Sequence, residues 1–138
     1  MNKKIKIISI IVIILIAVVY YTIGFIEKDR KIDKLKANHI TLPNAYITKF
    51  TSYRRLITVY YAFTYNAKTY SGYRSLGGID PSNESAFWNH TFAVMVDTTD
   101  PMNNAILITP HHFSKMNWGY PDSLKWVLKY YSTTFGSW

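Results

Sequence analysis

The chain of 138 residues contains no cysteine. This absence excludes disulfide bonds, a thiol nucleophile, thiolate metal ligands and a lipoprotein-type anchor. It leaves the cellular compartment open, because many exported domains also lack disulfide bonds.

Acidic residues are few, since 8 aspartates and glutamates stand against 16 lysines and arginines. The net charge of +8 is compatible with nucleic-acid binding, but the bases gather beside an apolar segment and at Arg54 and Arg55. Basic residues beside a membrane segment commonly meet anionic headgroups, each contributing about 1 kcal/mol. We therefore expect the lipid bilayer, and no nucleic acid, as a partner, with Lys28, Arg30 and Lys31 as headgroup contacts.

No residue pattern typical of a catalytic or metal site is evident. His111 and His112 are adjacent, so their side chains would diverge on a strand, and the other histidines have no recurrent ligand spacing to them. We interpret the two as a loop or surface pair. Ser114, His112 and Asp97 are the residue types of a hydrolytic triad, but no nucleophile-elbow sequence accompanies them. The sequence predicts no enzymatic activity, metal or cofactor.

The longest apolar run, IISIIVIILIAVVYYTIGFI at residues 7–26, contains no Asp, Glu, Lys or Arg. A membrane-spanning helix needs roughly 20 apolar residues, whereas a secretory signal has about 7 to 15 followed by small residues. Tyr20, Tyr21 and Phe25 stand where a cleavage site would need small residues, and they suit the interfacial belt. A buried core helix would need a larger domain around it. We expect an uncleaved single-pass anchor, preceded by a basic tail at residues 1–6.

Two rules disagree about the orientation of this anchor. The positive-inside rule counts lysine and arginine on both flanks and slightly favours a cytoplasmic C-terminal side. The N-terminus, however, begins like an export signal, with a short basic tail that leads into the apolar run. We favour the cytoplasmic (inner) membrane, with the C-terminal domain on the periplasmic or outer side.

Beyond the anchor, the pattern changes from helical to alternating. Residues 27–42 are expected to form a charged juxtamembrane stalk, and Pro43 is expected to end any helix there and open the folded domain. Residues 43–138 are expected to form one β-rich domain with an aromatic C-terminal tail. The segment RRLITVYYAFTY places five alternate side chains on one face: Ile57, Val59, Tyr61, Phe63 and Tyr65.

Turn signals separate the remaining strands. Asn66 suits a left-handed conformation in a hairpin that leads to KTYSGYRS. FWNHTFAVMVDTT and AILIT continue the strand pattern, with Pro101 preset for the turn between them. The predicted fold is mainly β: a single N-terminal transmembrane helix, then a small antiparallel β sandwich or partly open barrel with a short C-terminal helix.

The order VYYAFTYNAKTYSG, a variable loop, FAVMVDTTDP and MNNAILI resembles a loose family of small membrane-anchored β domains of unknown function. In that family, a Tyr-rich strand turns through Gly-Lys into a second strand, and a Val-rich strand runs into Asp-Pro-x-Asn-Pro. The similarity covers about residues 57–108; Ala67 stands in place of the glycine, Asn104 in place of the second proline, and Thr98 and Thr99 where an aromatic often stands. The resemblance implies a small β sandwich or barrel on a membrane anchor.

The C-terminal tail is dense in large side chains. Asp122 or Ser123 is expected to cap a short helix, in which Leu124, Val127, Leu128 and Tyr131 recur at helical spacing. The tail aromatics are expected either to cover the sheet or to bind a partner. These candidates are Trp118, Trp126, Tyr130, Phe135 and Trp138. We favour a packed tail, with Trp126 and Leu128 pointing inward.

Two classes of function remain open. In the first, the chain is a non-catalytic, membrane-anchored accessory protein of a bacterial envelope or membrane complex, with a protein partner. In the second, it is a free-standing envelope domain that binds a small ligand or neutralises a toxin, as an immunity protein does. The bacterial assignment rests on a composition rich in Ile, Lys and Asn.

Overall fold

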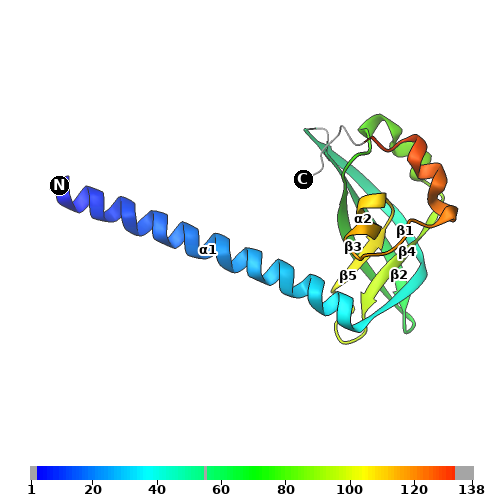
Figure 1. The fold of residues 1–138 in the computed structure, drawn as a ribbon, viewed down its shortest axis with the longest axis horizontal. Coiled ribbons are helices and arrows are strands. Elements are labelled where there is room, and N and C mark those ends of the chain that lie inside the picture. The colour runs from blue at the N-terminus through cyan, green and yellow to red at the C-terminus, as the bar shows by residue number, and fades with distance from the viewer. Residues whose placement is uncertain (1–2, 55, 133–138) are drawn as a thin grey trace. The chain divides into compact units, whose positions relative to one another are not determined.

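A computed structural model describes residues 3–54 and 56–132, with side chains described from Ile7 onward. The chain forms two compact units, Met1–Lys34 and Leu35–Trp138. Figure 1 shows the ribbon of each unit.

Helix α1 (Lys3–Asn38) includes the apolar segment and continues into the segment 27–42 predicted as a stalk. Its portion Ile7–Asn38 is long and apolar enough to cross a membrane. The large apolar side chains of residues 7–26 are all exposed. This agrees with the predicted membrane segment in length and composition.

The helix ends at Asn38, before Pro43, so the prediction that Pro43 ends the helix is wrong. His39 already begins strand β1, and its ring Nδ1 lies 3.1 Å from the Lys36 carbonyl oxygen at the helix end. Pro43 lies inside β1, where the register with the neighbouring strand shifts between Leu42 and Ala45. Proline cannot donate a ladder hydrogen bond, and such an irregularity is where a strand tolerates it.

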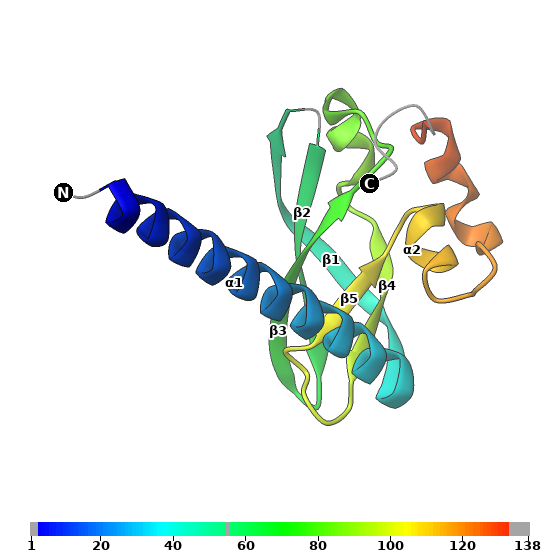
Figure 2. The same ribbon diagram turned by 60° about the vertical axis from the view of Figure 1, so that its left-hand side comes forward.

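The second unit is built on one five-stranded antiparallel sheet with the order β3-β2-β1-β4-β5. The strands are β1 (His39–Tyr53), β2 (Leu56–Tyr65), β3 (Lys68–Leu76), β4 (Thr91–Asp97) and β5 (Asn104–Leu107). The sheet curls into a half-barrel that brings β3 near β5 (Figure 2). The prediction of a mainly β, antiparallel domain is confirmed, and the partly open barrel describes it better than a two-sheet sandwich.

Both predicted tight turns form as their residues indicated. Asn66 and Ala67 have φ angles of 48° and 60° in the β2–β3 hairpin, which is the left-handed pair of a type I′ turn. In the β4–β5 turn, the Asn103 N–H donates to the Asp100 carbonyl at 2.8 Å, which places Pro101 at the first central position. These turns fix the register of the strands they join.

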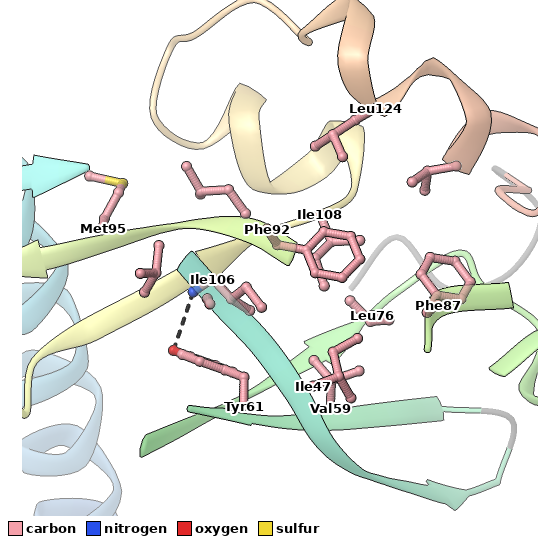
Figure 3. Packing of buried hydrophobic residues seen from close by; sticks show 14 of the residues in the cluster. Ile47, Val59, Tyr61, Leu76, Phe87, Phe92, Met95, Ile106, Ile108 and Leu124 are labelled. Atoms are coloured by element: carbon pink, nitrogen blue, oxygen red, sulfur yellow. Dashed lines mark hydrogen bonds between the residues drawn. The ribbon is translucent and has the colours of Figure 1, made fainter. Parts of the chain in front are cut away.

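The concave side of the sheet holds the hydrophobic core. Along β2, the alternate side chains Ile57, Val59, Tyr61 and Phe63 are buried, as their period-2 pattern predicted. Figure 3 shows Val59 and Tyr61 of β2 on the side of the sheet that faces Phe92 of β4 and Ile106 of β5. The core therefore forms inside the curl, between strands distant in sequence.

Within residues 56–132, three short helices accompany the sheet: η1 (Pro81–Phe87), α2 (Pro110–Ser114) and η2 (Asp122–Lys129). The predicted C-terminal helix is present as η2, but its N-cap is Pro121 rather than Asp122 or Ser123. Leu124 and Val127 are buried, whereas Leu128 is 44% exposed, so the prediction of an inward Leu128 is wrong. In a 3₁₀-helix, residues three apart share a face, and the residue four along turns away from it.

Candidate functional site

The predicted tail aromatics fall into three groups. Trp126 and Tyr130 are partly buried and pack against the core, which favours the sheet-covering interpretation for these two. Trp118 is 36% exposed, and its ring centroid lies 5.2 Å from that of His39. Phe135 and Trp138 lie outside the described residues.

Trp126 belongs to an aromatic cluster that joins η2 to η1 and β4. Its ring centroid lies 5.4 Å from Phe87, which is fully buried, and 4.4 Å from His90, which it stacks on. Tyr130 reaches the same Phe87 ring at 5.9 Å. Aromatic pairs at these separations stabilise packing beyond the area they bury. η2 is therefore held to the rest of the domain through its aromatic residues.

The convex side of strands β1–β3 carries a second set of aromatic residues, which we name the outer tyrosine face: Tyr46, Tyr53, Tyr60 and Tyr73. Tyr53 and Tyr73 are 71% and 73% exposed. The strand register places Lys49, Tyr60 and Tyr73 in one row across the three strands. The sequence pattern did not predict this face. The only sign of it is that Tyr60 and Leu56 alternate with the core residues of β2.

Cations accompany the outer tyrosine face. Lys49 Nζ lies 5.7 Å from the centroid of the Tyr60 ring, and Arg54 Cζ lies 5.2 Å from that of Tyr53. The Tyr60 and Tyr73 rings are 5.9 Å apart. No aspartate or glutamate occurs in the sequence between Asp33 and Asp80, the segment that contains all of β1–β3. The convex side is thus aromatic and positively charged.

Strands β3 and β5 are the two edge strands, and the curl of the sheet brings them close together. Side-chain hydrogen bonds connect them in place of a main-chain ladder, and we name this boundary the β3–β5 seam. The Tyr61 hydroxyl donates to Asn104 Oδ1 at 2.7 Å and accepts the Ile106 N–H at 3.2 Å, as Figure 3 shows for the second bond. Burial raises the pKa of Tyr61 to about 12. On β3, a Cβ at Gly72 would lie 2.5 Å from both Asn104 Oδ1 and the Tyr61 hydroxyl oxygen. Only glycine fits there without displacing these groups.

Arg74 makes the next bridge across the seam. Its Nη1 donates to the Ile106 carbonyl at 2.6 Å, so Tyr61 and Arg74 together satisfy the backbone of one β5 residue. Burial lowers the pKa of Arg74 to about 10. Within the described residues, no carboxylate forms an ion pair with this guanidinium.

His112 closes the end of the seam. The ring is buried; its Nδ1 accepts the Ile108 N–H at 3.1 Å, and its Nε2 lies 3.0 Å from the Ser75 carbonyl oxygen. Nδ1 accepts and Nε2 donates only in the neutral tautomer protonated at Nε2. Burial, and then the charge of Arg74, hold the pKa of His112 well below its usual range. The prediction of a surface pair is therefore wrong for His112, because the ring replaces missing strand hydrogen bonds.

The triad that could be written from sequence is not assembled. The Ser114 hydroxyl donates to the His111 carbonyl at 3.0 Å, and both ring nitrogens of His112 face backbone groups. Asp97 accepts a hydrogen bond from the Thr99 hydroxyl at 2.6 Å. This bond is the main reason why the pKa of Asp97 is lowered, and further hydrogen bonds add to the effect. In the described part of the chain, no three His, Asp or Glu side chains are grouped to hold a metal ion.

The expected headgroup contacts lie in the N-terminal unit. Lys28, Arg30 and Lys31 are exposed on α1, just beyond the apolar segment. Their contact with lipid stays a prediction.

Comparisons with family models, curated proteins and solved structures find no match to this chain. The resemblance to membrane-anchored β domains therefore rests on the motifs within residues 57–108 alone. Function has to be argued from the outer tyrosine face and the β3–β5 seam.

Proposed function

We propose that this chain is a non-catalytic, membrane-anchored interaction protein of the bacterial envelope, whose β domain binds an acidic protein partner through the outer tyrosine face. The apolar helix α1 supports the anchor, because its exposed side chains gain far more from lipid than from water. We keep the C-terminal domain on the outer side of the cytoplasmic membrane.

The observation that carries this proposal is the exposed, cation-flanked row of tyrosines on β1–β3. Tyrosine and arginine are enriched at the centres of protein interfaces, since an aromatic ring buries a large area with few rotatable bonds. The same strands contain basic residues and no acidic one. Charge complementarity therefore favours an acidic partner surface, which would raise the association rate as well as the specificity.

The anchor is tested first, with the full chain in its host membrane. It should remain in the pellet after washing with high salt or alkaline carbonate, since surface charge alone does not survive these washes. A soluble product that begins near residue 27 would contradict the anchor. Protease accessibility of the β domain in intact spheroplasts then reports its side of the membrane.

Partner binding is tested by purification of the full chain in mild detergent, followed by mass spectrometry of co-purified proteins. The double variant Tyr60→Ser/Tyr73→Ser should lose a stoichiometric partner. Met102→Ser is the matched control, because Met102 is 69% exposed on the β4–β5 turn and belongs to none of the strands β1–β3. Equal recovery of the partner by both variants would reject the outer tyrosine face as its binding surface.

The alternative function is a free-standing envelope domain that binds a small ligand or neutralises a toxin. The observation that favours it is Arg74, a partly buried cation without an acidic partner in the described residues. A monomer that co-purifies with no protein, yet binds a ligand at the seam, would support this alternative.

A further inference from the structure

Basic side chains from two elements gather at the end of the β3–β5 seam. Arg74 comes from β3, while His111 comes from α2 and Lys115 from its C-cap. We name these three residues the basic cluster. His111 directly precedes His112, whose Nε2 lies 3.0 Å from the carbonyl oxygen of Ser75, the residue after Arg74, so α2 lies beside the end of β3 that carries Arg74.

Arg74 is the strongest donor of the basic cluster. A guanidinium has five N–H donors, and the described structure gives Arg74 one protein acceptor, the Ile106 carbonyl. The side chain is partly buried, so water replaces the missing acceptors only in part. A buried cation without a counter-charge is unfavourable, and an anion bound beside it removes this penalty.

The scaffold holds the other two residues in place. The His112 ring accepts from the backbone of Ile108 and faces the Ser75 carbonyl, which follows Arg74 directly on β3. This pair of contacts fixes α2 against the end of β3. The Lys115 N–H donates to the His111 carbonyl at 3.2 Å, so these neighbours lie one turn apart on the same short segment. α2 and its C-cap residue Lys115 therefore lie beside the end of β3 that carries Arg74.

We propose that the basic cluster binds a phosphate group, with the Arg74 guanidinium as its principal donor and His111 and Lys115 as further cationic contacts. Arginine matches phosphate oxygens with paired N–H donors, and a phosphate dianion offers acceptors to several cations at once. The site is separate from the outer tyrosine face, because Arg74 lies on the opposite side of β3 from Tyr73. Partner binding by the outer tyrosine face and phosphate binding by the basic cluster can therefore be tested independently.

The test uses the isotope-labelled full chain in maltoside micelles, which carry no phosphate. Inorganic phosphate is titrated against sodium chloride at equal ionic strength, and the Arg74 side-chain N–H and His111 ring resonances are followed by NMR. Saturable shifts with phosphate, absent with chloride, are expected. Bound phosphate should also raise the pKa of His111, which burial and the neighbouring cations lower in the free protein. Shifts no larger with phosphate than with chloride would overturn the proposal.

Variants identify the donors. Arg74→Gln should weaken phosphate binding about tenfold or more, since a hydrogen bond to a charged group is lost. Arg74→Gln also disturbs the seam, so His111→Gln/Lys115→Gln provides a second variant that leaves the Ile106 contact intact. It should weaken binding severalfold with an unchanged fold. Lys49→Gln, on the convex side, is the matched control and should bind like the wild type. Wild-type affinity in the double variant would reject its two residues as contacts.

A second titration distinguishes the source of the phosphate group. Glycerol 3-phosphate represents a phosphate monoester, and inorganic phosphate represents the free ion. Tighter binding of the ester would assign the site to a phosphorylated small molecule or headgroup. Tighter binding of inorganic phosphate would assign it to the free ion. Failure of both, in a protein that still recovers its partner through the outer tyrosine face, would reject only the phosphate site.

Discussion

Strand β2 carries aromatic side chains on both faces, and the two faces have different surroundings. Tyr61 and Phe63 point into the curl of the sheet and are buried in the hydrophobic core. Tyr60 points to the convex side and is exposed beside Tyr73. Adjacent residues therefore have different roles. The Tyr61 hydroxyl replaces a strand hydrogen bond, and Tyr60 exposes its ring to solvent. Aromatic content alone does not separate core from surface; the curvature of the sheet does.

The sharpest test of this difference is a pair of truncations. Phe63→Ala should lower the free energy of unfolding by about 3–5 kcal/mol, because it leaves a cavity in the concave core. Tyr73→Ala, on the convex side, should change it by less than about 0.5 kcal/mol. Chemical denaturation of the full chain in detergent, followed by tryptophan fluorescence, measures both. Equal losses would mean that the convex side is also covered in the folded protein.

A smaller effect separates the hydroxyl groups of adjacent tyrosines. Tyr61→Phe should lower the free energy of unfolding by about 1–3 kcal/mol, since it leaves the Ile106 N–H and Asn104 without their partner across the seam. Tyr60→Phe removes a hydroxyl from the convex side and should be close to neutral. The same denaturation experiment compares them. If Tyr61→Phe were neutral, another group would have to satisfy the β5 edge.

The seam should also make stability depend on pH. The pKa of His112 lies well below its usual range in the folded protein, so the unfolded chain binds a proton there that the folded chain excludes. Stability should therefore fall as the pH drops below about 6.5, the unfolded value, and level off near neutral pH. Thermal melts across this range should show a weaker slope for His112→Asn. His111→Gln should keep most of the slope, and a slope that survives His112→Asn would assign the effect elsewhere.

The smallest effect is expected on the convex side. Lys49→Gln removes the cation near the Tyr60 ring and should lower the free energy of unfolding by at most about 0.5–1 kcal/mol, because the pair is exposed. Lys68→Gln, at the hairpin end of β3, is the control for loss of a lysine charge. Raising the salt concentration should change little, unlike its effect on partner association. A large loss would show that this pair is shielded from water.

Local patterns predicted most of the elements but misplaced their ends. The alternation along β2 and the Asn66 turn were predicted correctly, because each depends on residues close in sequence. The local pattern predicts that Pro43 ends the helix, but β1 already begins at His39, and the register shift that accommodates Pro43 depends on pairing with β4. α-Helical spacing predicts an inward Leu128, whereas η2 has 3₁₀ geometry and Leu128 is exposed.

The candidate sites were harder to predict than the elements. The density of large aromatic residues in the tail predicts a covering or binding surface, and Trp126 and Tyr130 pack on the core. The outer tyrosine face was not predicted, because the same strands also contain tyrosines that point inward. No sequence pattern distinguishes Arg74 from the many other basic residues of the chain. Its environment arises only when β5, far along the chain, comes alongside β3.

The sequence by itself determined the long apolar helix, the alternating faces of the strands and their tight turns, because these depend on composition and on neighbours within a few residues. Only the tertiary structure decided how far the sheet curls and what closes it. The curl brings Tyr61, Arg74 and His112 to the unpaired backbone of β5 and its extension, where each side chain supplies a hydrogen bond that a sixth strand would have made. Such long-range satisfaction of buried backbone groups has no local pattern, since the requirement appears only after the strands have come together.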